Sequence, residues 1–531
     1  MQNLKNPSNW YYVTNAEYSV YALDEKFANL LLANPSCEFY AKYYHPFAAI
    51  LVNNQTKQVI AIRDHFAEEP FFYYVDSEQI IFASTIHDIL TIQPCAIHQD
   101  QLLKNYDIGG LADFTEQTNY TGIFRLRPAS ELDFTTMHST RYWDLAKLRD
   151  NNKLSLASDE EYIARFESLL LEALKYQMSG NHNVAVEFSG GVDSTAILCA
   201  LTQLGIRPQL YTHYSAEDHE IHHEARMLND IVEILKLDDK IDYATENFDA
   251  RKVIDRCNHL FAGEIVSPSS IMTDPFHQKL NQAGIKIIFS GFGGDQCAST
   301  HAPLVPTLSE WVANGQSDLA YAELISLRKK KKLSINPLGL RLRLIKYTRL
   351  RVVVNAWLAL RRKYESWHYA RHGLIKDRTI HLKQYGNMFD YLYALVQGEY
   401  SNEFQFRIEE TALKSKLDNF RCRYPLLYPP LVEFIFSLPL DQLRHNGEAR
   451  LVIRCYTKKI LGIEKQFDKK GQIYSASLDR SLQDFKSWDL TFPDNIQWLL
   501  NKLTIDQRQL LVYLRHYAQT SYKAPKNEKT Y

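Results

Sequence analysis

The stretch Val184–Leu198, VAVEFSGGVDSTAIL, begins as an apolar β-prone run and continues as a helix-forming run. Ser189, Gly190 and Gly191 lie between the two runs. Glycines allow a backbone to approach a ligand closely, and the free N–H groups of a first helical turn attract anions. The stretch therefore predicts a strand, a tight turn and a helix that together bind phosphate. A lone Ser-Gly-Gly would be explained as well by a tight turn with a serine cap.

Asp193 favours the phosphate-binding interpretation over the simple turn. A carboxylate repels phosphate unless a divalent cation lies between the two groups. Ser194 and Thr195 add hydroxyl donors beside it. The stretch is not a P-loop, which requires GxxxxGK[ST] and places a lysine at the phosphates.

A second stretch, Ile287–Gln296 or IIFSGFGGDQ, repeats the order of strand, small residues and aspartate. Ligands bind at the carboxyl ends of strands in open α/β sheets, so Asp193 and Asp295 are predicted to share Mg²⁺. The residues predicted to hold a phosphate-bearing ligand or its metal are Ser189, Gly190, Gly191, Asp193, Ser194, Thr195, Ser290, Gly291, Gly294 and Asp295.

The composition excludes several classes of protein. The chain has 531 residues, 45% hydrophobic and 23% charged, with a net charge of −1, so no global field selects nucleic acid. It shows no signal-like N-terminus and no apolar run of about 18 residues, so we expect no membrane span. Its 7 cysteines are scattered without a CxxC pair, which favours reduced thiols in a cytoplasmic protein.

The patterns along the chain predict an α/β protein in two main parts. Residues 1–150 are β-rich, with paired runs around Asn53-Asn54 and Asp76-Ser77 that predict antiparallel hairpins. Residues 155–515 start with a helix capped by Ser158 and then alternate strands and helices, which predicts a parallel sheet and a largely helical C-terminal part. A basic, mostly helical segment spans 327–378, and 516–531 reads as a tail.

The two glycine motifs together resemble the ATP-pyrophosphatase domain of the asparagine-synthetase superfamily. The first part resembles that family's glutaminase-type domain, an α+β sandwich, through Arg63-Asp64, Pro70 and Phe82-Ala83-Ser84. The resemblance implies an ATP- and Mg²⁺-dependent ligase that adenylates a carboxylate, releases AMP and pyrophosphate, and joins the acyl group to an amine.

One departure from the family concerns the source of the amine. Active glutaminase domains of this type use an N-terminal cysteine, whereas this chain reads Met1-Gln2-Asn3 and its first cysteine is Cys37. We therefore expect no glutaminase activity. Branches without that cysteine include β-lactam synthetases, carbapenam synthetases and lasso-peptide cyclases, in which the substrate supplies the amine.

The chain is most similar in appearance to the lasso-peptide cyclases. That resemblance implies a leader-cleaved precursor peptide as substrate, a macrolactam as product, and a leader-binding protein and a leader peptidase as partners. A β-lactam-type cyclase, an ammonia-using ligase and a nucleotide-binding scaffold without turnover remain alternatives.

Several residues near the C-terminus carry or break the family pattern. Lys469 in DKKG matches a family lysine that suits charge developing in the transition state, with a surface lysine in a loop as the alternative. An acid expected two residues before Arg423 is replaced by Arg421, and an expected aspartate by Tyr428. Glu409 and Glu410 are candidate substitutes for that acid, although solvated helix charges are the simpler interpretation. Arg450 and Arg454 match basic residues of the family, with surface positions as the alternative.

Two further groups have a structural and a functional interpretation. His213, His219, His222 and His223 crowd one stretch, but no HExxH or carboxylate pattern accompanies them, so a loop is favoured over a metal site. The basic segment 327–378 is expected to be solvated surface, or else a surface that attracts an acidic peptide or an anionic membrane.

Overall fold

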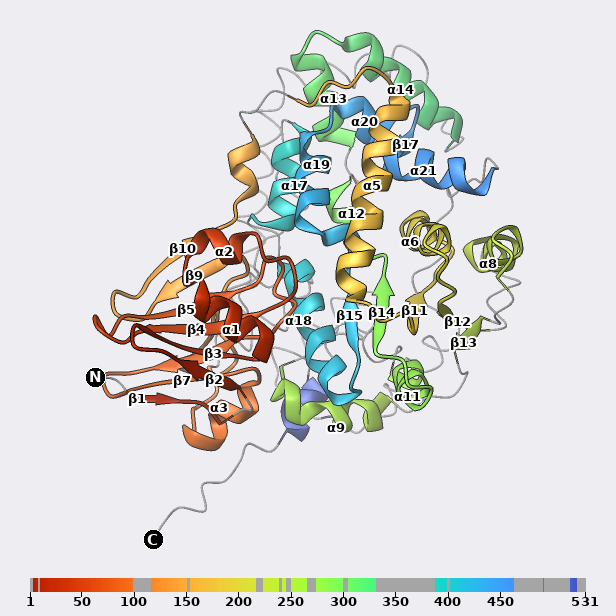
Figure 1. Ribbon diagram of the computed structural model, residues 1–531. Helices are drawn as coiled ribbons and strands as arrows, with labels where there is room; N and C mark the ends of the chain where they lie inside the picture. Colours follow the sequence, from red (N-terminus) through yellow and green to blue (C-terminus); the bar gives the residue numbers. More distant parts are fainter. Residues whose placement is uncertain are drawn as a thin grey trace.

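The structure is a computed structural model that describes residues 3–7, 10–98, 116–149, 153–215, 223–237, 241–244, 250–264, 274–298, 304–330, 387–398, 402–462, 490 and 516–522. Figure 1 shows the N-terminal strands gathered on one side of the molecule and the strands β11 to β15 on the other. The fold is mixed α/β, with a β-rich N-terminal part, a parallel-sheet region and a helical C-terminal part.

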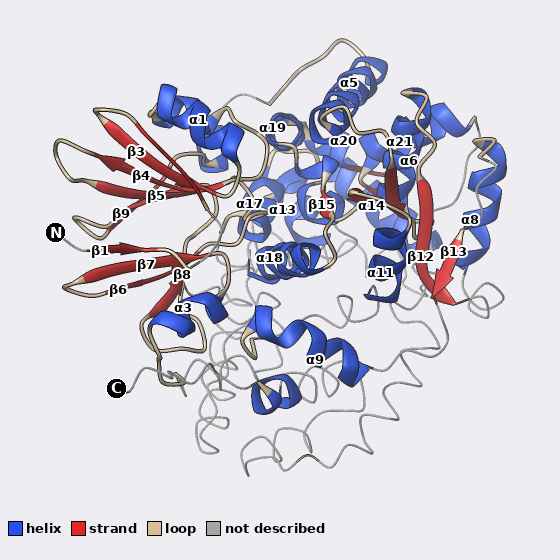
Figure 2. Cartoon of the chain, turned by 60° about the horizontal axis from the view of Figure 1, so that its bottom comes forward, coloured by secondary structure: helices blue, strands red, loops and turns tan. Residues whose placement is uncertain are grey.

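The N-terminal part is a sandwich of two sheets, which Figure 2 shows nearly edge-on. One sheet has the order β10-β9-β5-β4-β3-β2, and the other has the order β1-β7-β6-β8. The first comprises β2 (Tyr11–Thr14), β3 (Tyr18–Ala22), β4 (Ala48–Asn53), β5 (Val59–Arg63), β9 (Ser130–Asp133) and β10 (His138–Arg141). The second comprises β1 (Asn3–Lys5), β6 (Phe72–Val75), β7 (Gln79–Ala83) and β8 (Ile123–Arg125).

The alternation of side chains along each strand explains the layers. Ile50 on β4 and Phe82 on β7 belong to the core between the sheets, whereas their neighbours Leu51 and Ile81 belong to separate outer clusters. Successive side chains of a strand point to opposite faces, so each sheet needs cover on its outer side. That cover is provided by α1 (Glu25–Ala33) and α2 (Cys37–Ala41) on the larger sheet and by α3 (Ile86–Ile92) on the smaller one.

The two predicted hairpins exist, but they do not share a sheet. β4 pairs antiparallel with β5 in the larger sheet, and β6 pairs antiparallel with β7 in the smaller one. β1 also pairs with β7 in parallel. Both predicted hairpins are therefore confirmed, although hydrophobic alternation does not indicate which of the two sheets each hairpin joins.

The second part is built on a five-stranded parallel sheet with the order β13-β12-β11-β14-β15. Its strands are β11 (Val184–Glu187), β12 (Gln209–Ser215), β13 (Asp242–Ala244), β14 (Ile287–Ser290) and β15 (Arg421–Arg423). The chain lays down β11, β12 and β13 in one direction and then returns to place β14 on the other side of β11. The order reverses between β11 and β14, the two strands that carry the glycine motifs.

Helices cover both faces of this sheet. Val186 and Phe289 face a cluster that contains residues of α5 (Asp159–Met178), α6 (Val192–Gln203) and α21 (Leu451–Leu461). Ala185 and Ile288 face the other side, against α11 (Asp274–Gln282). The helix predicted after Ser158 is confirmed, since the Ser158 hydroxyl accepts a hydrogen bond from the Glu161 amide as a helix cap does.

The remaining elements complete the two parts. The helices are α8 (His223–Ile234), α9 (Ala250–Phe261), α12 (Gly294–Cys297), α13 (Leu304–Ala313), α14 (Ser317–Lys330), α17 (Met388–Val396), α18 (Asn402–Leu417), α19 (Pro429–Ser437) and α20 (Leu440–Leu443). Two 3₁₀ turns, η1 (Leu145–Leu148) and η3 (Pro425–Leu427), and a hairpin of β16 (Arg444–His445) and β17 (Glu448–Ala449) join them. Among the described residues no helix is both long and apolar enough to cross a bilayer.

The start of the predicted tail is part of the folded protein. Residues 516–521 are helical, and Asn258 on α9 donates a hydrogen bond of 2.8 Å to the Ala518 carbonyl. Tyr522 shares a hydrogen bond of 2.9 Å with His87 on α3 of the sandwich. The tail interpretation is therefore wrong for residues 516–522, and 523–531 lie outside the described residues.

Candidate active site

The first glycine turn lies at the carboxyl end of β11. Gly190 has a φ of 71°, a left-handed conformation that favours glycine, and Gly191 is the N-cap of α6 without a side-chain cap bond. The hydroxyls of Ser194 and Thr195 donate to the Gly191 carbonyl at 3.1 and 2.8 Å. These hydroxyls therefore shape the turn, and the backbone N–H groups of the first turn of α6 lie at its mouth.

The Ser189 side chain is more exposed than those of Ser194 and Thr195. Ser189 is partly exposed, its hydroxyl lies 3.3 Å from that of Ser194, and Ser194 is nearly buried. Thr195 is fully buried. Ser189 is thus placed to reach a ligand at the turn, and Thr195 in this structure supports the turn from behind.

The second glycine turn packs directly on the first. A Cβ added to Gly291 would lie 2.7 Å from the Ser194 nitrogen, and one added to Gly294 would lie 2.5 Å from the Asp193 carboxyl carbon. Real Cβ atoms do not approach other atoms this closely. Gly291 and Gly294 are therefore required for the contact between the two turns, a role that the sequence pattern alone does not reveal.

The carboxylates of Asp193 and Asp295 both form ion pairs with the guanidinium group of Arg450. The Nη1 atom of Arg450 lies 2.5 Å from Oδ2 of Asp193 and 2.8 Å from Oδ1 of Asp295. The Arg450 side chain is 5% exposed, and those of the two aspartates are 14% and 28% exposed. The predicted proximity of the two carboxylates is thus observed, and Arg450 is not a surface residue.

This cluster lies where the sheet order reverses, between β11 and β14. In open parallel sheets the loops after the two strands at such a point diverge to opposite faces and leave a crevice for a ligand. A sequence profile described as "Asparagine synthase" matches residues 165–489, more than half of the chain. The chain belongs to the asparagine synthase family. A second profile, described as "Glutamine amidotransferase domain", matches residues 37–143.

Curated relatives of this family are similar over part of their length. The chain is 29% identical over 161 residues to "Asparagine synthetase [glutamine-hydrolyzing] 3" of Bacillus subtilis (strain 168), which covers 28% of this chain and 24% of that protein. It is 22% identical over 246 residues to "Putative asparagine synthetase [glutamine-hydrolyzing] 2" of Methanocaldococcus jannaschii, covering 45% and 46%. It is also 26% identical over 164 residues to "Amidase chry2" of Gibberella zeae, covering 30% and 23%. The matches thus span between about a quarter and half of each relative.

The residues of this asparagine synthase family member fit ATP and a divalent cation. Two carboxylates meet at one point, and carboxylate oxygens are the ligands that Mg²⁺ prefers. The start of α6 lies beside them, and helix N-termini bind phosphate. Within the described part of the chain no three His, Cys, Asp or Glu side chains form a complete metal site. A cation here would therefore take its other ligands from phosphate and water.

Glu187 is a site residue that the sequence reasoning missed. It is the last residue of β11, is partly exposed and is level with Ser290 on β14. The Ser290 hydroxyl donates to its carboxylate at 2.6 Å, so Ser290 holds Glu187 at the carboxyl edge of the sheet. The sequence could have indicated Glu187 as a site residue, because it is the one charged residue of an otherwise apolar strand and lies just before the Ser-Gly-Gly turn.

Arg421 stands at the sequence position where the family has an acid, but it lies away from the two glycine turns. It is level with Ile287 at the start of β14, three residues before Ser290. Three residues of strand span about 10 Å, so Arg421 is at the opposite end of the strand from the site. Tyr428 is buried and donates a hydrogen bond of 2.7 Å to Glu172 on α5. The Arg421 position is therefore away from the carboxyl edge, and the Tyr428 hydroxyl is committed to Glu172.

Glu409 and Glu410 are not solvated helix charges, since their exposed fractions are 3% and 8%. Glu409 on α18 accepts hydrogen bonds from Arg63 at 2.8 Å and from Arg125 at 3.2 Å, both from the sandwich. Both the solvated interpretation and the use of Glu409 as a catalytic acid are therefore wrong, because a carboxylate held by two buried arginines is committed to the domain interface.

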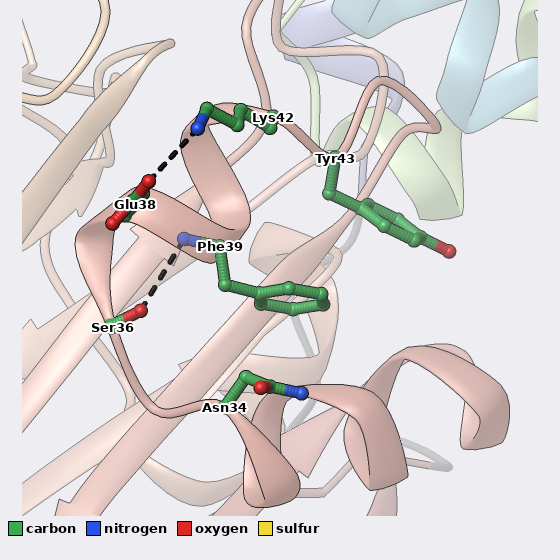
Figure 3. A pocket seen from close by; sticks show the side chains of 6 residues that line it. All are labelled: Asn34, Ser36, Glu38, Phe39, Lys42 and Tyr43. Carbon is green, nitrogen blue, oxygen red and sulfur yellow. Dashed lines mark hydrogen bonds and ion pairs between the residues drawn. The ribbon is translucent and has the colours of Figure 1, made fainter.

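Other predicted residues lie elsewhere. Lys469, Lys470, His219, His222 and the part of the basic segment from 331 to 378 are outside the described residues, and the side chains of His213 and His223 are also not described. Arg454 is buried and donates to the Ala449 carbonyl at 2.8 Å, next to Arg450. A pocket of about 380 Å³ lies on the outer helices of the sandwich, apart from the nucleotide turns, and Figure 3 shows its lining by Asn34, Ser36, Glu38, Phe39, Lys42 and Tyr43.

Proposed function

We propose that this protein is an ATP-dependent ligase that forms an amide bond through an acyl-adenylate and releases AMP and pyrophosphate. The observation that carries the proposal is the meeting of Asp193 and Asp295 at the reversal point of a parallel sheet. Family membership supports it, as does the glycine contact that holds Asp193 in place.

Each group of the site has a task in this reaction. Backbone N–H groups at Gly190, Gly191 and the start of α6 bind phosphate oxygens of ATP, and Ser189 adds a hydroxyl. Asp193 and Asp295 would hold Mg²⁺, and a bound Mg²⁺ would supply neutralisation of the phosphate charge. A carboxylate of the substrate attacks the α-phosphorus, and the bond to the pyrophosphate oxygen breaks. An amine then attacks the acyl carbon, loses a proton, and AMP departs.

We further propose that the amine belongs to the substrate and not to glutamine. Cys37 lies on α2 of the sandwich, where partial desolvation of the thiol raises its pKa, a hydrogen bond to Tyr40 lowers it, the Glu131 carboxylate raises it and the Lys147 charge lowers it, with a net rise. Such a thiol is a poor nucleophile. A tethered amine makes the second step unimolecular, which is worth about 7–11 kcal/mol when the geometry is right.

The substrate that best meets this need is a leader-cleaved precursor peptide, whose α-amine joins an Asp or Glu side chain in a macrolactam. Its partners would be a leader-binding protein and a leader peptidase. A small β-amino acid, closed to a β-lactam, and a ligase that uses free ammonia are the competing proposals.

The experiment is to incubate the protein with ATP, Mg²⁺ and a leader-cleaved precursor encoded near its gene. We expect AMP and pyrophosphate, and a product one water lighter than the linear peptide with a ring in its fragmentation spectrum. Asp295→Ala should lower the rate by about 10²–10³-fold. Pyrophosphate release with ammonia or a small β-amino acid but not with the peptide would replace the peptide by the small-molecule substrate. Formation of ADP instead of AMP would contradict the ligase mechanism.

A further inference from the structure

A single nitrogen atom of Arg450, Nη1, contacts both aspartates of the site. Nη1 contacts Asp193 Oδ2 at 2.5 Å and Asp295 Oδ1 at 2.8 Å. A divalent cation shared by these carboxylates would lie between the same two oxygens, at about 2.0–2.6 Å from each. The guanidinium nitrogen therefore occupies the position that the cation requires.

The backbone around Arg450 holds this arrangement in place. Arg450 has φ 59° and ψ 43°, a left-handed conformation that costs a residue with a side chain about 1–2 kcal/mol. It is the N-cap of α21 and directly follows the β16–β17 hairpin, and α21 packs on α5 and α6. Strain at a single residue persists where the surrounding structure imposes it, and it gathers at functional sites.

The guanidinium and a metal ion are both positively charged, so they repel each other and cannot both occupy this position. Two carboxylates and one guanidinium leave a net charge of −1, and the carboxylates neutralise the buried arginine. A divalent cation entering alone would place two positive centres within a few ångströms of each other or would leave Arg450 buried without an anion, and both arrangements are unfavourable. ATP removes the conflict, because its phosphates offer the guanidinium a new partner that it binds well.

We propose that Arg450 stands in for the divalent cation in the nucleotide-free protein, so that the metal binds only together with ATP and Arg450 then pairs with phosphate. This inference rests on the proposed function. It makes metal and nucleotide binding cooperative, and such coupling is reciprocal in binding free energy. A protein with this device does not hold a free metal ion between turnovers.

The test measures Mn²⁺ binding without nucleotide by electron paramagnetic resonance of the free ion. Wild type should bind Mn²⁺ weakly at the Asp193–Asp295 pair. Arg450→Asn should bind it about 10-fold or more tightly, within the 5–150-fold range of such couplings, because Asn tolerates the left-handed backbone and lacks the charge. Arg450→Gln is the second variant, with a side chain of more similar length.

Arg444→Gln is the matched control. It removes another nearly buried arginine from the same hairpin, one that pairs with Glu323 at 2.8 Å. The control should leave Mn²⁺ binding as weak as in wild type, and thermal unfolding should confirm that every variant is folded. Equal Mn²⁺ affinity in wild type and both Arg450 variants, or tight binding by wild type alone, would overturn the inference.

A second measurement separates this inference from the proposed function. The ATP affinity of wild type should rise strongly when Mg²⁺ is added, and that of Arg450→Asn should rise less, because its metal site is already available. A wild type that binds ATP with the same rise as the variant contradicts the role of Arg450 and leaves the ligase intact. Absence of any Mg²⁺-dependent ATP binding in wild type would remove the nucleotide site, and both proposals with it.

Discussion

Arg63 of the sandwich and Glu409 of α18 form an ion pair across the two parts of the chain, with Nη2 and Oε2 separated by 2.8 Å and neither side chain more than 4% exposed. Arg125 contacts the other carboxylate oxygen at 3.2 Å and also pairs with Glu264 at 2.5 Å. Four buried charges, two of each sign, thus join the sandwich to the α/β part. This network gives the sandwich a structural task that needs no glutaminase chemistry.

Glu409→Ala should destabilise the protein by about 3–5 kcal/mol, because it removes the carboxylate that pairs with both Arg63 and Arg125, which are buried. The measurement is the free energy of unfolding in denaturant, followed separately for the two parts if their transitions split. Glu38→Gln is the control, since its pair with Lys42 is exposed on α2. An unchanged midpoint in Glu409→Ala would show that the network does not hold the parts together.

Gly294→Ala should abolish most of the activity while the protein remains folded. The added Cβ would lie 2.5 Å from the Asp193 carboxyl carbon, so the carboxylate must move by about 1 Å, a displacement that can cost about 100-fold in rate. The measurements are Mg²⁺-dependent ATP binding and AMP formation. Gly315→Ala is the control, because its added Cβ would meet nothing within 4 Å, and it should keep its activity even though its φ of 76° adds a backbone strain that Gly294 does not have. Equal losses in both variants would refute the steric explanation.

Glu187→Gln should lower turnover by about 10²-fold with little change in ATP affinity. In the proposed reaction the attacking amine must lose a proton, and Glu187 is a carboxylate at the edge of the sheet where the acyl-adenylate would form. Ser290→Ala removes the 2.6 Å hydrogen bond but keeps the carboxylate, so its effect should be smaller. The rate should be followed against pH for both variants. If Glu187→Gln keeps the wild-type pH profile and rate, another group accepts the proton.

Glu68 should make the folded protein less stable as the pH rises. Burial raises the pKa of Glu68 from 4.5 to about 8; Arg423, with its Nη1 at 3.7 Å, opposes the shift, and Asp64 adds to it. The folded state therefore keeps a proton between these pH values that the unfolded chain releases, and stability falls across that window. Thermal unfolding of Glu68→Gln should depend less on pH there, whereas Glu78→Gln on an exposed turn should behave as wild type. A wild-type pH dependence in Glu68→Gln would assign the effect to other groups.

Lys469→Ala should lower turnover and leave ATP affinity nearly unchanged, because the lysine charge is needed most as negative charge develops on the leaving group. This prediction rests on the family pattern in DKKG. Lys470→Ala is the matched control, as the adjacent lysine lies outside the matched position. Single-turnover rates and an ATP titration measure the two effects. An equal loss in both would make Lys469 an ordinary phosphate contact.

The sequence by itself determined the local units of this protein. The runs at Val184–Leu198 and Ile287–Gln296 predicted two strands that end in glycine turns with an aspartate, and hydrophobic alternation predicted the hairpins of the sandwich. These features depend on residues within one turn or one strand of each other, so their spacing carries the information. Parallel pairing also follows from the alternation of strands and helices, since the crossover helices put the carboxyl ends of the strands on one edge.

Only the tertiary structure decided which distant charges meet. Arg450 contacts Asp193 across 257 residues, and Arg63 contacts Glu409 across 346 residues. The register of β15 against β14 places Arg421 at the far end of the strand from the site. No local pattern encodes these partners, because a buried charge is tolerated only where the folded chain brings its counter-charge, and that meeting depends on how the two parts pack.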